Sequence, residues 1–197
     1  MKILFLLPAE TIYDKQERVM GARHTPCSRE SLRSLKDLGP RLLELGATRV
    51  IASDLDEQCA AAIARRINAP VELWQSLRRF NWGKLHGTRA PKADKVYTEM
   101  EAIWSNAPDV PIKGGDSRTS YQKRIAIAKD RLESLRATSV VIAGEREIQQ
   151  ILGVNAVLQR NRIYQWESSR DNAAGEAQAV YATARRPQPQ LLHQPVA

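Results

Sequence analysis

The stretch RVIASDLDEQCAAAIARRINAPVELW, residues 49–74, predicts a strand, a helix and a second strand in direct succession. Residues 49–53 and 71–74 are short enough and apolar enough to be buried strands. Between them, apolar side chains recur at helical spacing, at Leu55, Cys59, Ile63 and Ile67. Two strands that are joined by a helix of this length are typical of a parallel sheet.

The same alternation continues on both sides of this stretch. Further strands are predicted at residues 2–7, 139–143, 162–166 and 177–182. Further helices are predicted at residues 28–46, 94–105, 117–136 and 145–152. This order favours an α/β fold, a three-layer α/β/α sandwich in which helices cover both faces of a mainly parallel sheet. Residues 12–27 show no clean period and are expected to form a loop.

Local residue chemistry predicts where several of these helices begin and end. Ser28 is expected to cap the helix that follows it. Gly39-Pro40 should kink or break that helix, and Gly46 should end it. Gly153 should close the helix at 145–152. Residues 1–182 are therefore expected to form one domain, and the Pro- and Gln-rich residues 183–197 a disordered tail.

The composition of the chain says more about where it works than about which reaction it performs. The net charge of +8 admits nucleic acid, phosphorylated ligands or an acidic protein partner. No stretch approaches the roughly 20 apolar residues of a membrane span, and the apolar run near the N-terminus is too short for a signal peptide. A cytoplasmic location is the simplest expectation.

Metal and cofactor sites are not predicted. No His, Cys and Asp cluster has the spacing of metal ligands. Cys27 and Cys59 are expected to be small buried hydrophobic residues, and could form a reactive pair only if the fold brings them together.

Short motifs along most of the domain resemble those of the histidine phosphatase superfamily, whose fold is that of phosphoglycerate mutase. They are Glu10-Thr11, Arg18 with Gly21, Ser53-Asp54-Leu55, Leu77 with Gly83 and Gly87, Gly114-Gly115-Asp116-Ser117 with Arg124, and Asn172-Ala173. Each motif is weak alone, but they occur in the family order at plausible spacing. The resemblance covers about residues 2–182 and implies the family fold.

The first catalytic motif of that family is altered in this chain. The resemblance implies an arginine and a nucleophilic histidine where Leu7 and Pro8 stand. Covalent phosphoryl transfer needs a side chain with a nucleophilic atom, and proline has none.

Three further family positions are also altered. Glu57 stands where an arginine is expected, and Arg79 where the proton-donating glutamate is expected. Gly144 stands at the position of the second histidine, or Ala143 if the alignment shifts by one residue. Because the two charges are exchanged, we expect Glu57 and Arg79 to pair across the former site.

These replacements favour a pseudo-enzyme that has no catalytic residues and acts as a binding or assembly module. Its ligand would be an anion, such as a phosphorylated molecule, or an acidic segment of an unknown protein partner. The candidate anion-binding residues are Arg18, Arg23, His24 and Arg79. The resemblance also allows a homodimer.

Two other functions remain open from the sequence. Arg23-His24 resembles a relocated arginine–histidine pair, which would make the chain an active phosphatase or mutase with His24 as nucleophile. Aromatic and basic residues also alternate within residues 74–86, a composition that can bind nucleic acid. No helix-turn-helix, zinc-finger or RNP motif accompanies that stretch.

Overall fold

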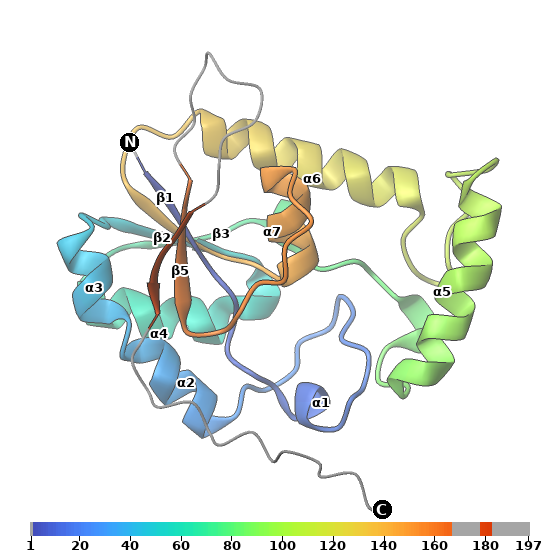
Figure 1. Ribbon diagram of the computed structural model, residues 1–197, viewed down its shortest axis with the longest axis horizontal. Helices are drawn as coiled ribbons and strands as arrows, with labels where there is room; N and C mark the ends of the chain where they lie inside the picture. The colour runs from blue at the N-terminus through green and yellow to red at the C-terminus, as the bar shows by residue number, and fades with distance from the viewer. Residues whose placement is uncertain (1, 167–177, 183–197) are drawn as a thin grey trace, which may run out of the picture.

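A six-stranded sheet forms the centre of the protein (Figure 1). The computed structural model describes residues 2–166 and the backbone of 178–182. The strands are β1 (Ile3–Leu6), β2 (Arg49–Ala52), β3 (Val71–Leu73), β4 (Ser139–Ile142), β5 (Arg162–Trp166) and β6 (Gln178–Ala182). Their order is β3-β2-β4-β1-β5-β6. The first four in this order are parallel, whereas β5 runs antiparallel to β1 and β6. The prediction of a mainly parallel sheet is confirmed.

Helices cover both faces of this sheet, as Figure 1 shows. They are α1 (Ile12–Lys15), α2 (Arg29–Lys36), α3 (Gly39–Glu44), α4 (Glu57–Ile67), α5 (Ala90–Trp104), α6 (Arg118–Glu133) and α7 (Glu145–Leu152). Three short 3-10 segments are η1 (Asp54–Asp56), η2 (Gln75–Leu77) and η3 (Gly83–Leu85). Helices α2, α3 and α4 lie on one face and α6 and α7 on the other, while α5 stands to one side. The three-layer sandwich is confirmed.

The core has two halves because side chains alternate between the faces of each strand. In β1, Ile3 and Phe5 pack with the cluster beneath α6 and α7, whereas Leu4 and Leu6 pack with the cluster beneath α2–α4. All four side chains are fully buried. Burial of each stabilises the fold by about 1.5–3 kcal/mol. Packing against both faces of the sheet therefore holds the ends of its strands in fixed positions.

Most of the predicted helix ends are confirmed. The Ser28 hydroxyl accepts the backbone N–H of Ser31 at the start of α2. The chain breaks after α2 and starts α3 at Gly39, where a Cβ would lie 2.7 Å from the Cβ of Arg66 on α4. Helix α7 ends at Gly153, which has a φ of 70°.

One expectation near the N-terminus is wrong. Residues 12–27 do not form only a loop, because Ile12–Lys15 make one helical turn. Thr11 and Asp14 close that turn with reciprocal side-chain-to-backbone hydrogen bonds. Four residues are too few to show a helical period in the sequence.

Two other expectations lie outside the described residues, the Asn172-Ala173 motif and the disorder of residues 183–197. Among the helices that the structure describes, none is long and apolar enough to span a membrane.

Candidate functional site

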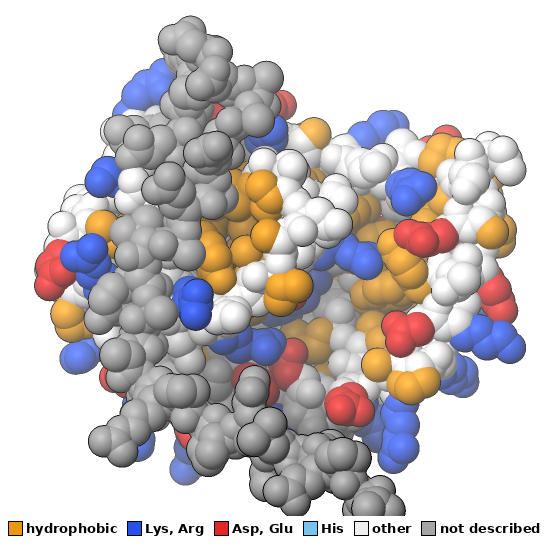
Figure 2. Space-filling model, in the orientation of Figure 1, with side chains coloured by type: hydrophobic (Ala, Val, Ile, Leu, Met, Phe, Trp, Pro, Cys, Tyr) orange, Lys and Arg blue, Asp and Glu red, His pale blue; other side chains and the backbone are white. Residues whose placement is uncertain are grey.

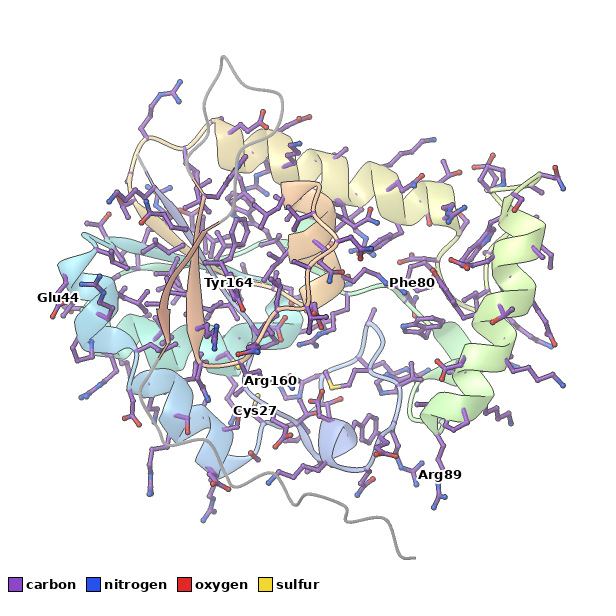
Figure 3. All side chains as sticks on the ribbon, viewed as in Figure 1. Cys27, Glu44, Phe80, Arg89, Arg160 and Tyr164 are labelled. Atoms are coloured by element: carbon purple, nitrogen blue, oxygen red, sulfur yellow. The ribbon has the colours of Figure 1, made fainter. Side chains whose placement is uncertain are left out.

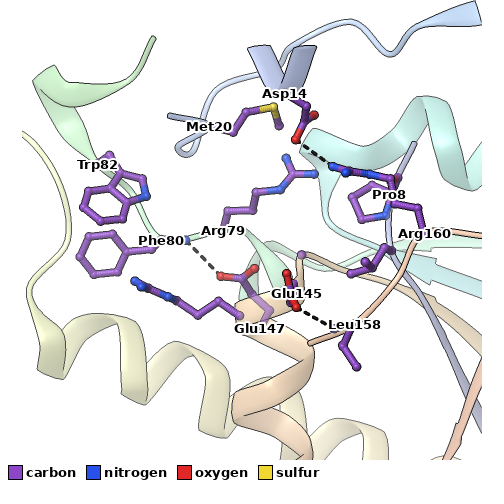
Figure 4. A pocket seen from close by; sticks show the side chains of 13 residues that line it. Pro8, Asp14, Met20, Arg79, Phe80, Trp82, Glu145, Glu147, Leu158 and Arg160 are labelled. Atoms are coloured by element: carbon purple, nitrogen blue, oxygen red, sulfur yellow. Dashed lines mark hydrogen bonds and ion pairs between the residues drawn. The ribbon is translucent and has the colours of Figure 1, made fainter. Parts of the chain in front are cut away.

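A pocket of about 390 Å³ opens beside the carboxyl ends of β1 and β4 (Figure 4). In parallel α/β sheets this edge is where ligands usually bind. Figure 2 shows the surface hollowed near the middle of this view, where basic, acidic and apolar side chains meet. The residues that line the pocket are Leu7, Pro8, Asp14, Met20, Arg79, Phe80, Trp82, Gly144, Glu145, Arg146, Glu147, Leu158 and Arg160.

The end of β1 contributes Leu7 and Pro8 to this pocket. Leu7 is buried, and its neighbour Pro8 presents a ring to the pocket and a carbonyl to Arg160. The Nε of Arg160 donates to that carbonyl at 3.2 Å. These two positions therefore offer the pocket apolar surface and no reactive side-chain atom.

Arg79 and Asp56 form a buried ion pair beside the pocket. Their Nη2 and Oδ1 atoms are 2.6 Å apart, and the side chains are 12% and 4% exposed. The second oxygen of Asp56 accepts the hydroxyl of Ser53 at 2.6 Å. Burial alone would lower the pKa of Arg79, but the carboxylates of Asp56, Glu147 and Asp14 outweigh burial and raise it. Arg79 is thus a fixed cation.

The expected partner of Arg79 was Glu57, and that expectation is wrong. Glu57 is exposed at the start of α4, and the ion pair that the structure describes for Arg79 is with Asp56. The cause is the 3-10 turn of residues 54–56, which precedes α4 and carries Asp56 toward the site.

Glu147 fills the space beside Gly144. A Cβ on Gly144 would overlap the Glu147 Oε2 atom and would lie 3.4 Å from the Arg79 Cγ. The Glu147 Oε1 accepts the Tyr121 hydroxyl at 2.8 Å and the Phe80 N–H at 3.2 Å. Burial raises the pKa of Glu147, while the Tyr121 hydrogen bond and Arg79 act in the opposite direction. A buried carboxylate thus occupies the region where the resemblance implied a histidine.

Asp14 and Arg160 close the pocket from the side of α1. Arg160 Nη2 lies 2.8 Å from Asp14 Oδ1, a contact drawn in Figure 4. The other Asp14 oxygen accepts the Thr11 N–H and hydroxyl, each at 2.7 Å. Burial by itself would raise the pKa of Asp14, but the hydrogen bonds from Thr11 and the Arg160 charge outweigh burial and lower it.

Arg146 is the one guanidinium of the pocket that forms no ion pair with the side chains described, those of residues 2–166. It lies in the first turn of α7, and its Cζ is 4.9 Å from the ring centre of Tyr97 and 5.7 Å from that of Trp82. The faces of aromatic rings attract a cation without neutralising it. Arg146 therefore keeps its hydrogen-bond donors available to a ligand.

The candidate anion-binding residues do not converge on one place. Arg79 lines the pocket, but Arg18, Arg23 and His24 are exposed and are not among the lining residues. Arg18 Nη1 instead donates to the Gly87 carbonyl at 2.6 Å.

Sequence reasoning missed Asp14, Arg146 and Arg160 in the pocket. Arg146 stands two residues after Gly144, just beyond the carboxyl end of β4, and that position was a usable signal. Arg160 offered no comparable signal, because it reaches Asp14 across 146 positions of the chain.

The fold and the position of the pocket define a phosphoglycerate mutase-like α/β protein. The sequence profile of the Histidine phosphatase superfamily (branch 1) matches residues 8–180. The chain therefore belongs to the histidine phosphatase superfamily.

Individual relatives agree with this family. The "Probable phosphoglycerate mutase GpmB" of Erwinia tasmaniensis is 27% identical over 145 residues, which span 71% of this chain and 66% of the relative. The phosphoglycerate mutase of Thermus thermophilus superposes with a TM-score of 0.70 at 20% identity, over 92% of this chain and 99% of the other. The α-ribazole phosphatase of Shigella flexneri gives a TM-score of 0.72 at 13% identity, over 91% and 95%. At these identities the solved structures establish the fold.

Proposed function

We propose that this protein binds an anionic ligand in the pocket and does not hydrolyse phosphoesters. The observation that carries the proposal is the composition of the pocket. None of the thirteen described residues that line it is a histidine, cysteine, serine or threonine. Covalent phosphoryl transfer needs such a nucleophile, a carboxylate, or a lysine or tyrosine, and no lysine or tyrosine is among these lining residues.

The carboxylates of the pocket are already engaged. Asp14 accepts hydrogen bonds from Arg160 and Thr11. The Glu145 Oε1 accepts the Leu158 N–H at 2.7 Å. Glu147 is buried and accepts hydrogen bonds from Tyr121 and Phe80. Each accepted hydrogen bond lowers the nucleophilicity of the carboxylate oxygen that accepts it.

The lining carries three arginines and three carboxylates, so the case for an anion rests on Arg146 and not on net charge. Arg79 and Arg160 are each paired with one aspartate, whereas Arg146 has no carboxylate partner among the described residues. An anion would therefore meet Arg146 first, with Arg79 and Arg160 lining the same pocket.

The chemical class of the ligand follows from its relatives and from the pocket. The names of the relatives refer to phosphoglycerate and to α-ribazole phosphatase activity. A phosphorylated small molecule fits this background and a pocket of about 390 Å³. An acidic segment of a protein partner presents the same kind of charge and is the second form of the ligand.

Calorimetric titration with inorganic phosphate and with 3-phosphoglycerate tests the proposal. A hydrogen bond to a charged group contributes about 1.5–3 kcal/mol, so Arg146→Ala should weaken binding about tenfold or more. Arg118→Ala is the matched control, because Arg118 also lies near an aromatic ring but does not line this pocket. Equal affinity in the wild type and Arg146→Ala would overturn the assignment of Arg146, and a complete lack of binding by the wild type would overturn a phosphorylated small molecule as the ligand.

The enzyme with His24 as nucleophile is the competing function. His24 is exposed and is not among the pocket residues, so phosphate bound at Arg146 would not meet it without movement of the loop. Turnover of an aryl phosphate by the wild type and by His24→Ala distinguishes the two functions.

A further inference from the structure

The fold brings the two cysteines of the chain into contact. The Sγ atoms of Cys27 and Cys59 lie 3.4 Å apart, although 32 positions separate them in the sequence. Cys59 is fully buried in α4, as expected of a small hydrophobic residue. Cys27, labelled in Figure 3, is only half-buried, on the segment between α1 and α2. The fold therefore brings the two cysteines together, which is what a reactive pair requires.

Hydrogen bonds position both cysteines. The Ala9 N–H donates to the Cys59 Sγ at 3.4 Å, and the Cys27 N–H donates to the Gln58 Oε1 at 3.2 Å. Cys27 also pairs with Thr11 in a short antiparallel bridge. Cys27 is thus held both by Thr11 and, through Gln58, by the helix that carries Cys59.

The two thiols differ in acidity. The pKa of Cys27 is lowered, chiefly by the hydrogen bond between the two sulfur atoms; Arg79 lowers it further, while burial, Asp56 and Asp14 oppose the shift. The pKa of Cys59 is raised by the same hydrogen bond and by burial. The more acidic thiol is therefore also the one that solvent reaches, which is the arrangement of an attacking cysteine and a resolving cysteine.

We infer that Cys27 and Cys59 form an oxidisable dithiol site whose substrate is a hydroperoxide and whose product is an intramolecular disulfide. The Cys27 thiolate attacks the peroxide, the O–O bond breaks, and the alkoxide takes a proton and leaves as an alcohol, or as water from hydrogen peroxide. The Cys27 sulfenic acid that remains is attacked by the Cys59 sulfur, which loses its proton as the hydroxyl leaves as water. The two thiols lose two electrons, and these reduce the peroxide. The sulfur atoms must approach from 3.4 Å to a bond length of about 2.05 Å.

The disulfide would lie directly behind the wall of the pocket. Ala9, which donates to Cys59, follows Pro8 in the wall, and Asp56, the partner of Arg79, stands three positions before Cys59. Oxidation would therefore tie the segment between α1 and α2 to the first turn of α4. This inference does not depend on the proposed ligand, because it concerns only the two thiols.

Timed oxidation of the purified full chain with hydrogen peroxide tests the site. We expect both titratable thiols to disappear together and the mass to fall by two hydrogen atoms. Because the folded chain holds the thiols together, the disulfide should form about tenfold faster or more in native protein than in the same protein unfolded in urea. Cys27→Ser should keep one titratable thiol, because the buried Cys59 is shielded from the peroxide.

Thermal unfolding supplies the second measurement. A disulfide that closes a loop of this length should raise the Tm of the wild type by on the order of 5–10 °C, whereas peroxide should leave the Tm of Cys27→Ser unchanged. A monomer that retains both thiols, a disulfide between two chains on a non-reducing gel, or equal rates in native and unfolded protein would each overturn the inference.

Discussion

The Oε2 atom of Glu147 lies where a side chain on Gly144 would begin. A side chain at position 144, such as the histidine that the family resemblance placed there, would therefore have to displace the Glu147 carboxylate. Gly144 has a φ of −63°, an ordinary value for any residue, so a substitution there tests the contact and not the backbone.

Gly144→Ala should lower the free energy of unfolding by about 1–3 kcal/mol, because the new Cβ displaces the Glu147 carboxylate from its hydrogen bonds. Urea denaturation measures the loss. The control is the same substitution in Glu147→Ala, where the overlap is gone and the cost should nearly vanish. An equal loss of unfolding free energy in both backgrounds would mean that the contact between position 144 and Glu147 does not affect stability.

Asp56→Ala should destabilise the protein by about 3–5 kcal/mol, because it leaves the buried Arg79 charge without its partner. Asp54→Ala is the matched control, since Asp54 pairs with the neighbouring Arg78 but both side chains are about one-third exposed. That surface pair should contribute no more than about 1 kcal/mol. Similar losses of unfolding free energy in the two variants would contradict the assigned difference in burial.

Glu147 should make stability depend on pH in a defined direction. Its pKa is raised in the folded protein, so its contribution is fully present below the unfolded value of about 4.3 and is lost as the pH rises through the folded value. Glu147→Gln, which stays neutral, should therefore gain stability relative to the wild type as the pH rises from about 4 to about 8. Urea denaturation at several pH values measures this difference, and a difference that is constant or of opposite sign would refute it.

Ser28→Ala should cost about 1 kcal/mol of unfolding free energy, because the Ser31 N–H at the start of α2 loses its acceptor. Ser34→Ala, in the middle of the same helix, should cost less, since alanine favours helix interiors. Equal losses in the two variants would show that the cap does not stabilise α2.

The sequence predicted those features whose causes are local. The Ser28 cap and the end of α7 at Gly153 depend on a few neighbouring residues, and both were located correctly. The alternation of strands and helices was likewise enough to predict the layers and the mainly parallel sheet.

The composition of the pocket could not be predicted in the same way. The partner of Arg79 shifted from Glu57 to Asp56 because of one 3-10 turn, which no sequence period reveals. Arg160 enters the pocket through a contact with Asp14, which is far away along the chain. Such contacts depend on the order of the strands in the sheet, and no short segment of the sequence determines that order.

The most direct test of the central claim is turnover of an aryl phosphate by the purified protein, measured beside His24→Ala at neutral and mildly acidic pH. None of the described residues that line the pocket is a histidine, cysteine, serine or threonine, so we predict no turnover above buffer from either protein. Turnover by the wild type that is abolished in His24→Ala would contradict the account, because it would show that a histidine outside the pocket performs the chemistry.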